Sequence, residues 1–167
     1  MQRTLGLRFE ESAKLNAGRA LVEAKKTGRV TITAGTKGGL KRTVSASPKA
    51  ITALVRAAAV QGRDRSMIPA SDSYRDFQQA AYRELREAGG TGFHGERHSY
   101  AQERYEALIG APAPVVEGWK RNERFERLAE AVGVTLQEAK AADAWARWIV
   151  AVELGHRRTE VTNAYLG

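Results

Sequence analysis

Residues 29–47, RVTITAGTKGGLKRTVSAS, carry the strand pattern that most narrows the folds open to this chain. Val30 and Ile32 alternate with polar residues, a glycine-rich turn follows, and Val44 lies in the returning segment. Apolar residues elsewhere recur mainly at helical spacing. The sequence therefore predicts an α+β fold that is mostly α-helical, with a small antiparallel sheet made by a β-hairpin at about residues 29–46.

Helices are predicted on both sides of this hairpin. Their starts carry capping signals: Ser47 before Pro48, then Ser73, and the possible capping box of Thr135 and Glu138. The expected helices lie at about 9–26, from 48 onward, 73–88, 96–109, 119–132 and 135–154, with a last short one at the end. The side chains expected inside are Ile51, Leu54, Val55, Ala58, Phe77, Ala81, Leu85, Tyr100, Tyr105, Trp145 and Trp148.

Length and composition fit one ordinary domain with a hydrophobic core. The chain has 167 residues, of which 43% are hydrophobic, and no apolar run approaches the roughly 20 residues of a membrane helix. It has no cysteine, which excludes disulfides and thiolate metal sites and fits an intracellular protein. We expect a cytoplasmic protein with no membrane partner.

The positive charge is concentrated in one segment. Between residues 25 and 63 there are nine Lys and Arg residues and no Asp or Glu, whereas the whole chain carries a net charge of +8. A single-sign block in a folded domain favours a polyanionic partner, either nucleic acid or a membrane surface. A basic surface that is merely solvated is the other interpretation.

Three short motifs hold residues suited to phosphate chemistry. In HGERH, His94 and Arg97 can face one point near a helix N-terminus, where backbone N–H groups attract anions. In GLRFEE, Arg8 follows an apolar turn, and a structural ion pair with Glu11 is the alternative to a functional role. Lys37 lies in the hairpin turn, where a solvated lysine is the ordinary interpretation. No Asp, Glu and His cluster has metal-ligand spacing, so no metal and no cofactor are expected.

The order of these motifs resembles the catalytic domain of the tyrosine recombinases, the phage-integrase family. The chain presents GLRFEE, the hairpin TKGGLKRTV, HGERH, LGH, and a tyrosine nine residues after that last histidine. The resemblance extends from Arg8 to Tyr165. It implies a site-specific recombinase that cleaves and rejoins double-stranded DNA through a 3′-phosphotyrosine intermediate, in association with the bacterial nucleoid.

The resemblance also implies a role for each matching residue. Tyr165 would be the nucleophile, Arg8 and Arg97 would bind the phosphate, and Lys37 would be the general acid for the 5′-oxygen. His94 would assist proton transfer and His156 would hydrogen-bond a phosphate oxygen, with His98 in support. Other expected DNA-binding residues are Lys25, Lys41, Arg42, Arg157 and Arg158, although a solvated face is as good an interpretation of the last two. The chemistry fits these residue types, because a phenol with a pKa near 10 needs activation and a phosphorane gains negative charge.

The sequence departs from the family pattern in three places. No DNA-binding clamp domain precedes Arg8, an insert at about 111–140 separates Arg97 from His156, and only two residues follow Tyr165. We therefore interpret residues 1–167 as a single catalytic domain, a fragment of an integrase of a mobile element that is a homo-oligomer on DNA when full length. The alternatives are a truncated, inactive DNA-binding or assembly module, a type IB topoisomerase, and a simple helical DNA-binding regulator.

Overall fold

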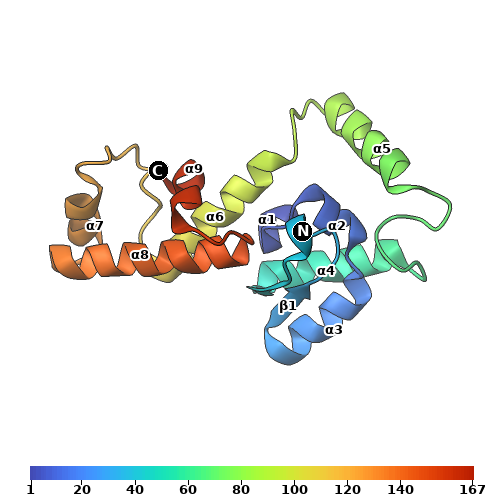
Figure 1. Cartoon of the computed structure of the whole chain (residues 1–167), viewed down its shortest axis with the longest axis horizontal. Coiled ribbons are helices and arrows are strands. Elements are labelled where there is room, and N and C mark those ends of the chain that lie inside the picture. Colours follow the sequence, from blue (N-terminus) through green and yellow to red (C-terminus); the bar gives the residue numbers. More distant parts are fainter. The chain divides into compact units, whose positions relative to one another are not determined.

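The computed structural model describes residues 1–167, which form two compact units, Met1–Arg97 and His98–Gly167 (Figure 1). The division falls within helix α6 (His94–Ile109), whose first turn belongs to the first unit. The chain is mostly helical and has one two-stranded antiparallel sheet, so the predicted fold class is confirmed. None of its helices combines the length and the apolar composition that crossing a membrane requires.

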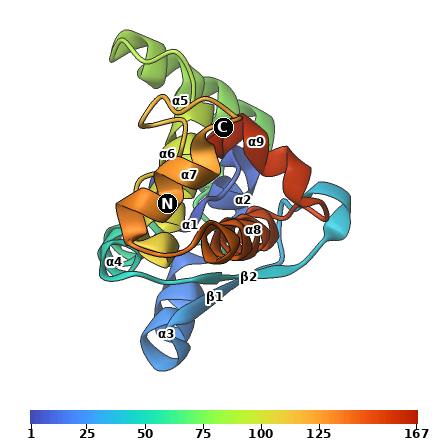
Figure 2. The same ribbon diagram turned by 90° about the vertical axis from the view of Figure 1, so that its left-hand side faces the viewer.

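The first unit is built around the hairpin. Strands β1 (Arg29–Ile32) and β2 (Arg42–Ser45) pair antiparallel with Val30 opposite Val44, and the short 3-10 helix η1 (Lys37–Gly39) lies in the turn between them (Figure 2). Val30, Ile32 and Val44 are fully buried, as the alternation predicts. The surrounding helices are α1 (Gln2–Leu5), α2 (Phe9–Lys14), α3 (Ala17–Thr27), α4 (Pro48–Gln61) and α5 (Tyr74–Glu87). Helix α3 packs against both α4 and β1.

The single helix predicted at 9–26 is wrong, because the chain breaks between α2 and α3. Leu15 is extended, and the Asn16 side chain accepts the backbone N–H of Arg19 at 2.9 Å as the N-cap of α3. The buried Gln61 side chain accepts a second α3 amide, that of Ala17, at 2.5 Å. The new helix start therefore depends partly on a residue at the far end of α4.

Helices α4 and α5 begin at the predicted caps, Ser47 and Ser73. The buried face of α4 is made by Ala50, Leu54, Ala57 and Gln61. Val55 was expected inside and is exposed instead. On α5 the expected core residues are only half-buried. Aromatic rings from this helix and its flanks gather around Phe9, namely Tyr74, Phe77, Tyr82 and Phe93.

The second unit contains helices and loops and has no strand. It contains the rest of α6, then α7 (Arg124–Val132), α8 (Leu136–Glu153), the 3-10 helix η2 (Thr159–Thr162) and α9 (Asn163–Leu166). The predicted capping box of Thr135 and Glu138 starts α8. Residues 111–140, the expected insert, form a loop, α7 and the first turn of α8; here Ala111, Leu128 and Ala139 make a small core.

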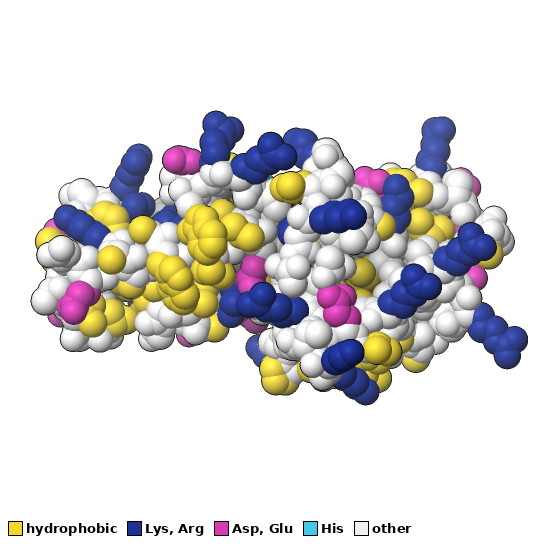
Figure 3. All heavy atoms as spheres, turned by 60° about the horizontal axis from the view of Figure 1, so that its bottom comes forward, with side chains coloured by type: hydrophobic (Ala, Val, Ile, Leu, Met, Phe, Trp, Pro, Cys, Tyr) yellow, Lys and Arg dark blue, Asp and Glu magenta, His cyan; other side chains and the backbone are white.

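The outward face of α8 differs from the prediction. Tyr100 and Tyr105 on α6 are buried as expected, but Trp145 and Trp148 are 51% and 54% exposed. Figure 3 shows hydrophobic side chains gathered over this helix. The buried face of α8 instead includes the charged pair Asp143 and Arg147. The aromatic side chains therefore face solvent, and the helix turns its charged pair inward.

Candidate active site

The Arg8 motif is organised by a fully buried carboxylate, Glu11. Glu11 is the third residue of α2, and it accepts the backbone N–H of Arg8 at 2.6 Å, as glutamate commonly does at a helix start. Its other partners are the guanidinium of Arg8, at 3.0 Å, and that of Arg42 on β2, at 2.5 and 2.7 Å. One carboxylate therefore binds two arginines.

These contacts keep Glu11 charged. Burial by itself raises the pKa of Glu11, but the hydrogen bonds and charges of Arg42 and Arg8 outweigh it and lower the pKa below its ordinary value. The Arg42 side chain is buried, whereas that of Arg8 is 28% exposed. Arg8 is therefore the arginine of this group that keeps a solvent-facing part. Arg42, expected among the DNA-binding cations, holds the carboxylate instead.

Arg97 is anchored to the same segment of chain. It lies in the first turn of α6, is 2% exposed, and donates a hydrogen bond from Nη1 to the carbonyl of Gly6. Gly6 ends α1 in the left-handed region, at φ 60°, and precedes Arg8 by two residues. The two motif arginines of the first unit are thus attached to one short turn, Gly6–Arg8.

The hairpin turn presents lysines to solvent. Lys37 and Lys41 are both exposed. At its base, Gly35 approaches the backbone of Glu10 so closely that a Cβ would lie 2.8 Å from the Glu10 carbonyl carbon and oxygen. Because Glu10 is next to Glu11, this contact holds the turn beside the Arg8 motif. Lys25, in the last turn of α3, is also exposed.

His94 begins α6 rather than preceding it, and its side chain is exposed. It is three residues from Arg97, so both lie in the first helical turn, as the spacing predicted.

In the second unit, Tyr165 lies between two histidines. Its ring centroid is 4.6 Å from that of His98 and 6.1 Å from that of His156, and the residue is 5% exposed. The structure thus brings together the expected nucleophile and two of the expected histidines. The tyrosine is packed within the unit and does not extend from it.

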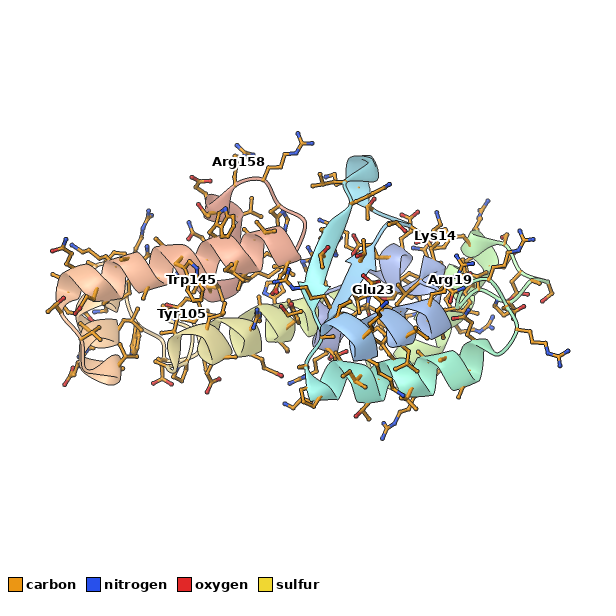
Figure 4. The ribbon with its side chains drawn as sticks, turned by 90° about the horizontal axis from the view of Figure 1, so that it is seen from below. Lys14, Arg19, Glu23, Tyr105, Trp145 and Arg158 are labelled. Atoms are coloured by element: carbon orange, nitrogen blue, oxygen red, sulfur yellow. The ribbon has the colours of Figure 1, made fainter.

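A second buried carboxylate supports this arrangement. Glu153, three residues before His156, accepts the Tyr100 hydroxyl at 2.8 Å and the Arg104 guanidinium at 2.9 and 3.1 Å. These bonds join the end of α8 to α6. Arg157 and Arg158 follow and are exposed; Figure 4 shows Arg158 reaching away from the helices of its unit.

The sequence reasoning missed the supporting residues rather than the motif residues. Glu11 was considered only as an alternative partner for Arg8, while Glu153 and the pair Asp143 and Arg147 were not singled out. One signal was present, because Asp143 and Arg147 are four residues apart and can pair on one helix face. That spacing, however, is also typical of surface ion pairs.

No group of three or more His, Asp or Glu side chains is arranged to hold a metal ion. A surface hollow of about 430 Å³ lies beside α5 and contains none of the expected site residues; it is lined by Gln78, Gln79, Tyr82, Arg83 and Arg86.

Comparison with known proteins decides the family. Residues 1–103 match the family model described as Integrase. The chain belongs to the integrase family. The matched part of this integrase contains Arg8, Lys37, His94 and Arg97, whereas His156 and Tyr165 lie beyond it. No curated protein and no solved structure matches the chain. Membership in the family indicates a role in DNA integration or recombination and implies that the protein binds DNA.

Proposed function

We propose that this integrase is the catalytic domain of a tyrosine recombinase, a site-specific enzyme that cleaves and rejoins double-stranded DNA. The observation that carries the proposal is the packing of Tyr165 against His156 and His98 in a chain whose family is integrase. Residues 1–167 act as one catalytic domain, with an insert at about 111–140, and the protein works as a homo-oligomer on DNA.

In the cleavage step, the Tyr165 phenol oxygen attacks the scissile phosphorus and the bond from phosphorus to the 5′-oxygen breaks. The phenol proton leaves with the help of His94, and Lys37 gives a proton to the departing 5′-oxygen. The product is a 3′-phosphotyrosine bond and a free 5′-hydroxyl. A 5′-hydroxyl then attacks this bond and restores the phosphodiester and the phenol, so the reaction needs no ATP.

Arginines stabilise the charge that develops on the phosphate. Arg8 and Arg97 donate to the non-bridging oxygens, since planar guanidiniums match two oxygens at once, and His156 donates to the same group. Glu11 supports this role because it fixes the Arg8 side chain while leaving part of it exposed.

Exposed cations bind the DNA backbone. We assign this role to Lys25, Lys37 and Lys41, with Arg157 and Arg158 in the second unit. We remove Arg42 from the set because its Nη1 and Nη2 both donate to Glu11. Contacts of this kind position the duplex without reading its sequence.

The proposal is tested by trapping the covalent intermediate. The full-length protein is mixed with a pool of nicked duplexes randomised on both sides of the nick. Cleavage near the nick releases a short fragment that diffuses away, so religation fails and the protein stays on the DNA under denaturing conditions. We expect adducts that share a sequence, and none with Tyr165→Phe. Tyr74→Phe, on exposed helix α5, is the matched control and should form adducts normally.

Other outcomes separate the alternative functions. Salt-dependent DNA binding without a Tyr165-dependent adduct would contradict the proposal and indicate a non-catalytic DNA-binding module. Relaxation of any supercoiled plasmid, without preference for the captured sequence, would indicate a topoisomerase.

A further inference from the structure

The proposed mechanism makes no use of Arg147, an arginine on α8 that is 5% exposed. Its Nε donates to both oxygens of Asp143, at 2.9 and 2.8 Å. The other two guanidinium nitrogens donate to different acceptors: Nη1 to Oδ1 of Asn163 at 3.0 Å, and Nη2 to the carbonyl of Gly167 at 2.8 Å. A single side chain thus connects α8 to both ends of α9.

The carboxylate beside Arg147 is itself tied to another helix. The Tyr105 hydroxyl on α6 donates to Oδ1 of Asp143 at 2.8 Å. Burial, followed by the charge and hydrogen bond of Asp143, raises the pKa of Tyr105, so this hydroxyl stays protonated and remains a donor. Asp143 therefore holds Arg147 in one orientation relative to α6 and α8.

Helix α9 depends on such outside contacts. It has only four residues, too few to be stable alone, and its last carbonyls have no partner within the helix. The carbonyl of Tyr165 accepts a hydrogen bond from the side-chain Nε2 of Gln102 at 3.2 Å. The carbonyl of Leu166 accepts the backbone N–H of Val115 at 3.0 Å. The two bonds from Arg147 lie two residues before and two residues after Tyr165.

Stability alone is a poor reason for this arrangement. A buried ion pair can often be replaced by apolar residues of similar volume with no loss of stability. The planar guanidinium does what an apolar side chain cannot, because its fork reaches three acceptors in fixed directions. The Arg147 guanidinium can therefore hold the segment that carries Tyr165 in one position relative to α8.

We propose that Arg147 is a positioning residue that sets the place of the Tyr165 nucleophile by holding the Asn163 side chain before it and the Gly167 carbonyl after it. This inference rests on the proposed function, in which Tyr165 attacks DNA. Arg147 contacts no reacting atom, so its effect is on the rate of attack and not on DNA affinity. A displacement of about 1 Å in a reacting group can cost roughly a hundredfold in rate.

The test uses three variants of the full-length protein and the duplex captured above. Arg147→Lys keeps the charge and loses the fork. The double variant Asp143→Asn with Arg147→Met removes both charges of the ion pair, so no unpaired charge stays buried. The asparagine side-chain oxygen can still accept the Tyr105 hydroxyl. Asn163→Ala removes one of the contacts at an exposed residue, so the fold is not at risk. Arg127→Met, at an exposed position of α7, is the control for loss of an arginine.

Two quantities are measured: the single-turnover rate of adduct formation with all DNA bound, and the DNA dissociation constant. We expect the rate to fall about a hundredfold in the double variant, less in Arg147→Lys and least in Asn163→Ala. The dissociation constant should stay within about twofold of wild type in every variant, since no phosphate contact is removed.

The results separate the two proposals. If wild type forms no Tyr165 adduct, the proposed function is wrong and the positioning role falls with it. If wild type forms the adduct and folded Asn163→Ala and Arg147→Lys cleave at its rate, only the positioning role is overturned. Weaker DNA binding with an unchanged rate would also overturn it, because Arg147 would then act on affinity.

Discussion

The two units each bury an arginine against a carboxylate, and they use the pair in opposite ways. In the first unit the carboxylate is shared: Glu11 accepts from Arg42 and Arg8, and Arg8 keeps an exposed part. In the second unit the arginine is shared: Arg147 donates to Asp143 and to both ends of α9. A shared carboxylate positions a cation, whereas a shared guanidinium positions the backbone.

The largest expected effect on the free energy of unfolding comes from removing the charge of the shared carboxylate, Glu11. Glu11→Gln should lower the free energy of unfolding by about 3–5 kcal/mol, because it leaves the buried Arg42 guanidinium without a charged partner. Urea denaturation measures this. Glu10→Gln is the matched control, since the half-exposed Glu10 pairs with Lys14 and should cost no more than about 1 kcal/mol. Equal losses in the two variants would contradict the central role of Glu11.

A smaller loss is expected when the second unit loses its carboxylate charge. Asp143→Asn should lower the free energy of unfolding by about 1–3 kcal/mol, because Arg147 keeps Asn163 and Gly167 as acceptors and Tyr105 keeps its own. The same urea experiment applies, with the exposed Glu130→Gln as control. A loss as large as that of Glu11→Gln would remove the distinction between the units.

The two buried groups Glu11 and Tyr105 should respond to opposite ends of the pH scale. The lowered pKa of Glu11 means that its contribution is complete above the ordinary value of 4.5 and is lost as the pH falls through the lowered value. The raised pKa of Tyr105 means that its contribution is present below pH 10 and is lost as the pH rises above it. Each group gives a slope of at most about 1.4 kcal/mol per pH unit.

Urea denaturation across the pH range checks both slopes. Glu11→Gln should reduce the acid slope and leave the alkaline one, and Tyr105→Phe should do the reverse. Part of each slope should remain, because the pKa of Glu138 is also lowered by its hydrogen bonds to Thr135 and that of Tyr74 is also raised by burial. A variant that flattened both slopes would show that the two groups are not independent.

The smallest expected effects are at helix starts, where the units should behave alike. Asn16→Ala in the first unit and Thr135→Ala in the second each remove a side-chain acceptor for a backbone N–H, which should cost about 1 kcal/mol. Thermal denaturation measures both. Thr52→Ala, on the exposed face of helix α4, is the control, and a clearly larger loss for Asn16 would identify its bond to the Arg65 carbonyl as the additional contribution.

The parts of the fold that could be predicted are those set by neighbouring residues. The hairpin follows from alternation around a glycine-rich turn, and the starts of α4, α5 and α8 follow from their caps. The break before α3 was missed although Asn16 is a good N-cap, because the helical spacing continues across it. Part of the reason for the break is Gln61, forty-four residues away.

The candidate site divides in the same way. The order of the motifs named Arg8, Lys37, His94, Arg97, His156 and Tyr165 without any structure. The sequence did not identify the residues that hold these side chains in place, such as Glu153, because they belong to no recognisable motif. Residue type alone predicts a DNA-binding cation at Arg42 and core residues at Trp145 and Trp148, whereas Arg42 and Arg147 are the buried side chains and both tryptophans are exposed.

By itself the sequence determined the helical fold with its hairpin, the acid-free basic segment and the motifs that suggest the chemistry. Only the tertiary structure decided which cations face solvent and which are buried. The physical reason is that burying a guanidinium costs free energy unless hydrogen-bond acceptors in the interior pair with it. For Arg42 the acceptor is thirty-one residues away, and for Arg147 two of the three acceptors lie on the segment that carries Tyr165.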